Sequence, residues 1–191
     1  MIRETRAMFR PATAASLASL ILAAPLAAQT MTGEDAAAML YAPKTAEVVI
    51  TEGALPEDQA NMLAMVAKDQ PYYAAIAISP DEGLMSEATM AAANHHTIEA
   101  ASAVALAQCN ANKKGAADCV IVATVRPEGW EARPLQLSSS ATEDFVANQG
   151  AALALSAATG AWGIGPSPDD AVTACAAKQE AATDCTVAIA E

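Results

Sequence analysis

Aromatic side chains are scarce in this chain: Phe, Trp and Tyr together make up 4% of its 191 residues. Small-molecule pockets are usually lined by aromatic and other large apolar groups, so the composition gives little support for an aromatic-lined pocket. The apolar fraction is nevertheless 53% and comes largely from alanine. Such a composition suits helices of small residues that pack closely against their neighbours.

Positive charge is also scarce, since ten Lys/Arg stand against 22 Asp/Glu and the formal net charge is −12. An anionic surface repels phosphate backbones and anionic lipid head groups. The charge balance therefore argues against binding to nucleic acid or to a membrane surface.

Long hydrophobic runs are missing as well, and the most apolar stretch belongs to a predicted secretory signal peptide over residues 1–28. Three arginines in residues 1–10 precede the apolar run 14–26, and small residues follow it. About 13 apolar residues are too few to cross roughly 30 Å of hydrocarbon, which argues against a membrane anchor. Cleavage is predicted after Ala28, because an earlier cut would put Pro25 at the third position back. Met8 is an alternative start.

Removal of this peptide takes away three arginines and Glu4, leaving 163 residues with seven Lys/Arg, 21 Asp/Glu and a net charge of −14. That length suits a single domain with a sizeable core. No second apolar run approaches the roughly 18 residues of a spanning helix, so no membrane span is expected after signal removal. The expected location is periplasmic or secreted.

The most specific feature of the sequence is an internal duplication. Residues 107–123 and 173–189 both read as an Ala-rich run, Cys-x9-Cys, and a β-branched run with Asp before the second Cys. Upstream, residues 75–83 and 152–160 share an alternating Ala/Ile/Leu run that ends in Ser and is followed four residues later by Gly. Each copy is predicted to form a strand, a turn, a return strand, a helix and a closing strand, which is a β-β-α-β unit.

These units predict an α+β fold: a mostly antiparallel sheet with helices packed on it, two repeats related by pseudo-twofold symmetry, and an N-terminal α/β extension. The single domain 29–191 divides into the extension 29–71, repeat 1 (72–126), a connecting segment 127–150 and repeat 2 (151–191). In the repeats the return strands are placed at 84–92 and 161–164, and the helices begin after Thr97 and after Asp169 or Ser167.

The flanking segments carry further expectations. The extension should contain a helix 33–40 capped by Thr32, a strand 47–51, and a helix 56–68 whose buried stripe is Met62 and Val66, with Leu63 as a further candidate. The connecting segment should contain a strand 131–137 and a helix 141–148, with Ser140 as cap and Glu143 as its capping-box partner.

The four cysteines of an exported chain predict two disulfides. The identical spacing in both copies favours Cys109–Cys119 and Cys175–Cys185, each joining the end of a helix to the start of a strand. Two alternatives stay open: pairing across the repeats, and a four-cysteine zinc site, which normally uses shorter Cys-x2–4-Cys spacings. No Cys-x-x-Cys motif supports thiol oxidoreductase chemistry.

His95 and His96 are the only histidines, and Glu99 follows about one helical turn later. On a helix one of the histidines and Glu99 could face one metal ion, or a histidine could act as a general base. No His-Glu-x-x-His frame or third ligand is nearby in the sequence. A solvated polar turn ahead of a helix at Thr97 is therefore the expected alternative.

Other motifs support chemistry less well. Met62 and Met65, with Met39 and Met31 upstream, could bind copper(I) through thioethers, but they fit equally well as core residues. The Gly-x-Gly at Trp162–Gly165 lies in a predicted hairpin strand, not at a strand-to-helix turn, so it does not predict nucleotide binding. Ser138-Ser139-Ser140 has no nucleophile-elbow frame and is expected to form a loop and a helix cap.

With this repeat, the chain resembles a family of small secreted bacterial proteins built from a domain of unknown function. The family pattern is a strand of Ala-Ile-Ala-x-Ser type, a turn, a Trp-Gly strand, and an Ala-rich helix and a strand joined by two cysteines. Here residues 75–79, the four cysteines and Trp162-Gly163 carry it, over about residues 72–191. The first copy has Leu84-Met85 in place of Trp-Gly. The resemblance implies structural motifs and no reaction.

Sequences similar to the whole chain, including residues 84–89 and 129–135, are sometimes named 5-aminolevulinate synthase. That activity implies a large pyridoxal-phosphate fold, a Schiff-base lysine and cytosolic acyl-CoA. An exported chain of 163 residues is too short for that fold, and its lysines lie in no cofactor-binding frame, so this activity is not expected.

We expect a non-catalytic binding or interaction protein of the cell envelope, without a cofactor, whose partner is a protein or a small ligand. The alternatives are an enzyme centred on His95, His96 and Glu99, a periplasmic metal-binding protein, and a structural or stress-related envelope factor. A pocket that holds the histidine pair would favour catalysis, whereas a flat apolar patch between the repeats would favour protein binding.

Overall fold

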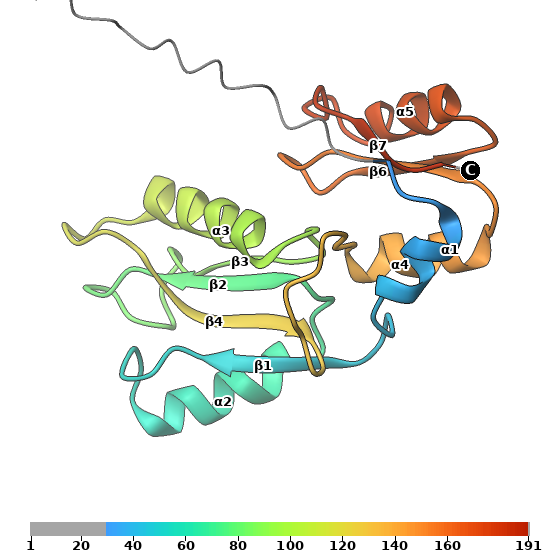
Figure 1. The fold of residues 1–191 in the computed structure, drawn as a ribbon. Coiled ribbons are helices and arrows are strands. Elements are labelled where there is room, and N and C mark those ends of the chain that lie inside the picture. Colours follow the sequence, from blue (N-terminus) through green and yellow to red (C-terminus); the bar gives the residue numbers. More distant parts are fainter. Residues whose placement is uncertain (1–29, 191) are drawn as a thin grey trace, which may run out of the picture.

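The computed structural model describes residues 30–190, which form an α+β fold of five helices and two antiparallel sheets (Figure 1). This confirms the predicted fold class, although the strands are divided between two sheets instead of one. The predicted signal peptide, residues 1–28, and its cleavage site lie outside the described residues. None of the helices in the described part of the chain has the length and apolarity needed to span a bilayer.

The first sheet has the order β1-β4-β2-β3, with β1 Ala46–Ile50, β2 Ala74–Ile78, β3 Met90–Ala92 and β4 Val120–Pro127. Helix α3 (Ile98–Asn112) covers one face and helix α2 (Glu57–Ala67) the other, as Figure 1 shows. Every residue of β2 is buried because successive side chains point to opposite, covered faces. Ala75 and Ala77 pack under α3, whereas Ile76 and Ile78 pack with α2.

The second sheet has the order β6-β5-β7, with β5 Ala152–Leu155, β6 Trp162–Gly165 and β7 Thr186–Ile189. Helix α5 (Pro168–Ala176) covers one face, while α4 (Ser139–Ala147) and α1 (Gly33–Met39) contribute to the cluster on the other. A methyl group added to Gly163 would overlap the backbone nitrogen of Cys175. Helix α5 therefore lies directly on the backbone of β6, and only glycine leaves room for it.

The two repeats share several details of their backbone. In each, the first strand is central, with the return strand on one side and the closing strand on the other. The register shifts between Ile76 and Ala77 in β2, and between the matching Leu153 and Ala154 in β5. These features agree with the duplication in the sequence, and the pseudo-twofold relation between the repeats stays a prediction.

The strand register corrects one equivalence expected from the sequence. Ala77 pairs with Met90 in the first sheet, and the matching Ala154 pairs with Gly163 in the second. The counterpart of Trp162-Gly163 is therefore Thr89-Met90, not Leu84-Met85. Residues 84–89 form turns, which shortens the expected return strand 84–92 to Met90–Ala92.

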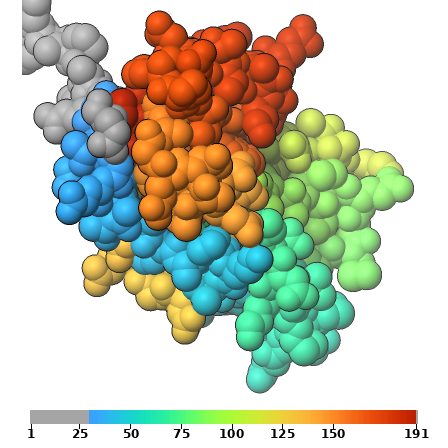
Figure 2. All heavy atoms as spheres, turned by 90° about the vertical axis from the view of Figure 1, so that its right-hand side faces the viewer, coloured from blue at the N-terminus to red at the C-terminus, as the bar shows by residue number. Residues whose placement is uncertain are grey.

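The N-terminal extension ties the two halves together. Thr32 caps α1 as predicted, and Met31 exchanges backbone hydrogen bonds with the edge of β7. The chain then continues into β1 at the edge of the first sheet. Figure 2 shows this extension (blue to cyan) against the region of α4 (orange), with the second repeat (red) above and the first (green) on the right.

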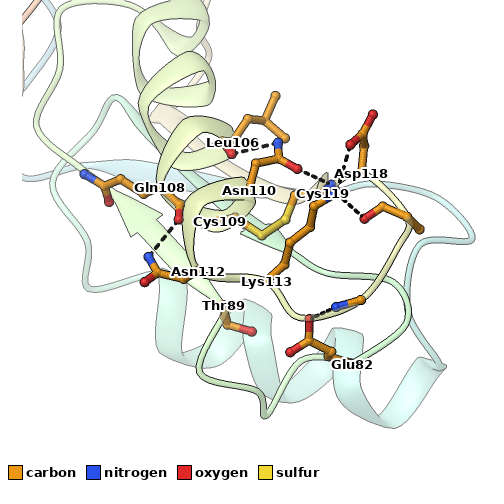
Figure 3. Close-up of a disulfide and its surroundings, with 12 residues drawn as sticks. Glu82, Thr89, Leu106, Gln108, Cys109, Asn110, Asn112, Lys113, Asp118 and Cys119 are labelled. Carbon is orange, nitrogen blue, oxygen red and sulfur yellow. Dashed lines mark hydrogen bonds and ion pairs between the residues drawn. A yellow bond between two sulfur atoms is a disulfide. The ribbon is translucent and has the colours of Figure 1, made fainter.

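Both predicted disulfides are present. Cys109 is bonded to Cys119 and Cys175 to Cys185, and no cysteine is free. Figure 3 shows the first bond at the end of α3, where the Asn110 side chain accepts a hydrogen bond from the Cys119 amide. Each bond closes a loop with a sequence separation of 10, which stabilises the fold by roughly 2–3 kcal/mol in the chain-entropy model.

Two expectations for the connecting segment are wrong. Residues 131–137 form no strand, although Leu135 and Leu137 are buried at alternate positions. Helix α4 begins at Ser139 and is capped by the Ser138 hydroxyl, which accepts from the Ala141 amide, so Ser140 is not the cap. The local sequence favoured Ser140 because Glu143 follows it three residues later, whereas the hydrogen bonds of the Ser138 and Ser140 amides to His96 and Asn94 come from the first repeat.

The buried stripe of α2 is also different from the expected one. Leu63 and Ala67 are buried, whereas Met62, Met65 and Val66 are 43%, 72% and 63% exposed. The helix packs on the first sheet through Leu63 and Ala67, which belong to the same core cluster as Ile76 and Ile78. Its methionines face outwards and are not the core residues that the sequence suggested.

Candidate functional site

The histidine pair lies where the first repeat (72–126) meets the connecting segment (127–150) and the second repeat (151–191). His95 and His96 are 7% and 5% exposed, so the expected solvated turn is wrong. They belong to a short segment between β3 and α3, where the second repeat passes from β6 to α5 with fewer residues. Asn94 in this segment has a φ of 63°, in the left-handed region that Asn tolerates better than most residues.

The start of α4 is held by this segment and its neighbours. The amides of Ser138, Ser139 and Ser140 donate in turn to His96 Nδ1, to the Tyr72 carbonyl and to Asn94 Oδ1. The connecting segment is thus anchored to the first repeat through three consecutive amides that a helix N-terminus leaves without partners inside the helix.

His96 connects the first repeat to both other parts. Its Nδ1 accepts from the Ser138 amide at 3.1 Å, and its Nε2 lies 3.3 Å from the Ala161 carbonyl of the second repeat. The neutral ring with its proton on Nε2 satisfies both contacts. Burial lowers the pKa of His96 to about 4, so the ring is neutral at neutral pH.

His95 packs against the second repeat at the same place. Its backbone pairs with Tyr73, and a methyl group added to Gly160 would lie 3.0 Å from its Nδ1. This nitrogen is buried and has no hydrogen-bond partner among the described residues. Burial lowers the pKa of His95 as well, which keeps the ring neutral at neutral pH.

The structure does not bring the three predicted metal or catalytic residues together. Glu99 is exposed in the first turn of α3, while both nitrogens of His96 face backbone groups. Within residues 30–190, no three His, Cys, Asp or Glu side chains form a cluster able to hold a metal ion. The four methionines are also separated, because Met31 and Met39 pack with the second sheet and Met62 and Met65 lie on the outside of α2.

A cavity of about 380 Å³ lies beside His96. It is lined by Met31, three residues around the start of α3, residues 134–136, two residues at the end of β5, and residues 186–188 of β7. The first repeat, the connecting segment, the second repeat and the N-terminal extension therefore all contribute to one pocket. No sequence pattern marks it, because its wall comes from five separate stretches of the chain.

The lining is mainly apolar, with Leu135, Leu155 and Val187 among its larger side chains. Its polar groups are His96, Thr97, Gln136 and Thr186. Several of these already serve the fold: Thr97 Oγ1 caps the Ala100 amide, and Gln136 Oε1 accepts from the Trp130 indole. The pocket is thus an apolar hollow with a few hydrogen-bonding groups in its wall.

Two other motifs have structural roles. Trp162 Nε1 donates to Asp144 of α4 at 2.9 Å, and Lys178 lies over its ring, so the Trp-Gly strand holds α4 and α5 in place. Ser138 caps α4 and is fully buried.

Comparison of the chain with protein-family models, with curated proteins and with solved structures found no match. The resemblance to the secreted bacterial family stays a prediction. The two local disulfides are the part of its pattern that the structure contains.

Proposed function

We propose that this protein is a non-catalytic binding protein of the cell envelope, which holds a small molecule in the pocket between its first and second repeats. The observation that carries the proposal is the cavity of about 380 Å³. Pockets for small molecules typically measure about 300–1,000 Å³, are mostly apolar and occur where structural units meet. The hollow shape favours a small ligand over the flat protein-binding patch that the sequence left open.

The chemistry of the wall supports binding without catalysis. His96 is the one titratable residue among the described residues that line the pocket. Its two nitrogens are engaged with the Ser138 amide and the Ala161 carbonyl, so neither is available to take a proton from a bound molecule. His95 does not line the pocket and faces Gly160 instead.

An extracytoplasmic location is supported by the two disulfides, because such bonds persist in oxidising compartments. The predicted signal peptide is the other argument for export.

Binding is tested with N-phenyl-1-naphthylamine, an uncharged dye whose fluorescence rises in apolar surroundings. Ala100 lies in the pocket wall and Ala103 is exposed on the same helix, so Ala100→Phe fills the pocket and Ala103→Phe is a matched control. We expect Ala100→Phe to weaken dye binding at least about tenfold and Ala103→Phe to leave it unchanged. Ala157→Phe, at an exposed lining position, repeats the test without disturbing a helix.

Circular dichroism checks that each variant keeps its fold. Equal dye affinity in the wild type, Ala100→Phe and Ala157→Phe would place the dye elsewhere and refute the proposal. Absence of any dye binding to the wild type would refute it too.

A further inference from the structure

The pocket beside His96 has no charged side chain among the described residues that line it, although the chain is rich in carboxylates. We infer that the ligand of this pocket is an uncharged organic molecule, an inference that rests on the proposed binding function. A charged group buried without a counter-charge loses its hydration and gains no compensating ion pair. An uncharged molecule avoids that cost and still buries its apolar surface against the wall.

An anionic ligand would find no Lys or Arg among the described residues that line the pocket. The nearest cation in sequence is Arg133, beside Pro134 of the wall, but its guanidinium lies 3.8 Å from the centre of the Tyr41 ring and donates to the Met39 carbonyl.

The other cations of residues 30–190 also lie outside the wall. Four of them form ion pairs, one lies over an aromatic ring and one lines a separate hollow: Lys44 with Glu143, Lys113 with Asp118, Lys114 with Glu87, Arg126 with Glu47, Lys178 over Trp162, and Lys68 beside Asp69. The excess of carboxylates over the whole chain adds a long-range repulsion of anions.

A cationic ligand is attracted to the acidic protein at long range, but inside the pocket it also lacks a counter-charge. No Asp or Glu lies among the described residues that line the pocket. His96 contributes no charge there at neutral pH, since burial keeps its ring neutral. Ions of either sign are therefore disfavoured by the wall itself, and anions are disfavoured by the surface as well.

The test uses octan-1-ol, octanoate and octylammonium, which share one alkyl chain and differ in the charge of the head group. Each competes with N-phenyl-1-naphthylamine for the wild-type protein at about pH 7.5. At this pH the alcohol is uncharged, octanoate is an anion and octylammonium is a cation. We expect the alcohol to displace the dye at a concentration at least about tenfold lower than either ion. The comparison is repeated at about 0.01 M and about 1 M salt, between which the Debye length falls from about 30 Å to about 3 Å.

The salt dependence distinguishes a preference for the alcohol that arises in the pocket from one that arises at the protein surface. A preference for the alcohol that persists at high salt comes from the uncharged wall, whereas one that vanishes there comes from screened surface repulsion and refutes the inference. Thr186→Lys adds a cation to an exposed part of the wall, and Ala103→Lys adds one outside it. Octanoate should compete about tenfold better with Thr186→Lys and unchanged with Ala103→Lys.

The outcomes distinguish the two proposals. Octanoate or octylammonium competing as well as the alcohol would overturn the inference and leave the binding function intact. Failure of the dye itself to bind the pocket would overturn the binding function, and the inference with it.

Discussion

Acidification should weaken this fold through His96, the buried residue that joins the two halves. The ring accepts from the Ser138 amide through Nδ1 and approaches the Ala161 carbonyl through Nε2. Protonation turns Nδ1 into a donor that faces another donor, so the hydrogen bond with the Ser138 amide is lost. The charged ring is also buried and therefore lacks hydration by water. The neutral form is the one that fits the folded protein.

The size of the effect follows from the two pKa values of His96. Burial lowers its pKa in the folded protein from 6.5 to about 4. As the pH falls through 6.5, the unfolded chain takes up the proton first, and the free energy of unfolding decreases by about 1.4 kcal/mol per pH unit until the pH reaches about 4. The total loss is about 3 kcal/mol, and below the folded pKa the contribution no longer changes.

The assay is urea unfolding followed by circular dichroism between about pH 7.5 and about pH 4, on the wild type and His96→Asn. Asn keeps an acceptor for the Ser138 amide but does not titrate and does not reach the Ala161 carbonyl. The variant should be about 1 kcal/mol less stable at the upper pH and the more stable of the two at the lower one, so the two curves cross. The neighbouring His95, whose pKa is also lowered by burial, is the same in both proteins, as are the carboxylates. Parallel curves over this range would refute the assignment.

Three further predictions concern the fold and use urea unfolding of the oxidised protein. Replacing both cysteines of the disulfide between α3 and β4 by alanine should lower the free energy of unfolding by about 3 kcal/mol, and a loss below about 1 kcal/mol would contradict the loop-closure argument. Gly163→Ala should cost about 3 kcal/mol or more, since its methyl group would meet the backbone of α5, whereas Gly53→Ala, with a φ of 72° and open space around it, should cost about 1 kcal/mol. Ser138→Ala should cost about 1 kcal/mol through loss of the α4 cap, and Ser140→Ala close to nothing; the reverse order would restore the cap expected from the sequence.

Much of the local structure follows from short-range patterns. Thr32, Thr97 and Ser167 cap helices that the sequence placed within a few residues of their observed ends. Capping depends on a hydroxyl and on an amide two or three residues away, so local sequence contains the information. Local sequence failed for α4, because it favoured Ser140, whereas Ser138 is the cap and the amides at this helix start donate to His96 and Asn94 of the first repeat.

The candidate site was only partly predictable. The sequence singled out His95 and His96 because they are the only histidines, but it assigned them to solvent. Burial depends on what packs over a residue, and here the second repeat and the connecting segment do so from positions more than 40 residues away in the chain. The remaining wall of the pocket is made of apolar and small polar residues without a motif, so no local signal could have pointed to it.

The sequence by itself predicted the α+β class and favoured the observed disulfide partners, because the periodicity of strands and helices and the Cys-x9-Cys spacing are both short-range patterns. The tertiary structure alone decided that the strands form two sheets, that the histidine pair is a buried joint, and that a hollow remains beside it. These features arise where separate parts of the chain meet and compete for hydrogen bonds and apolar contacts. Spacing along the sequence does not encode that competition, so only the packed structure resolves it.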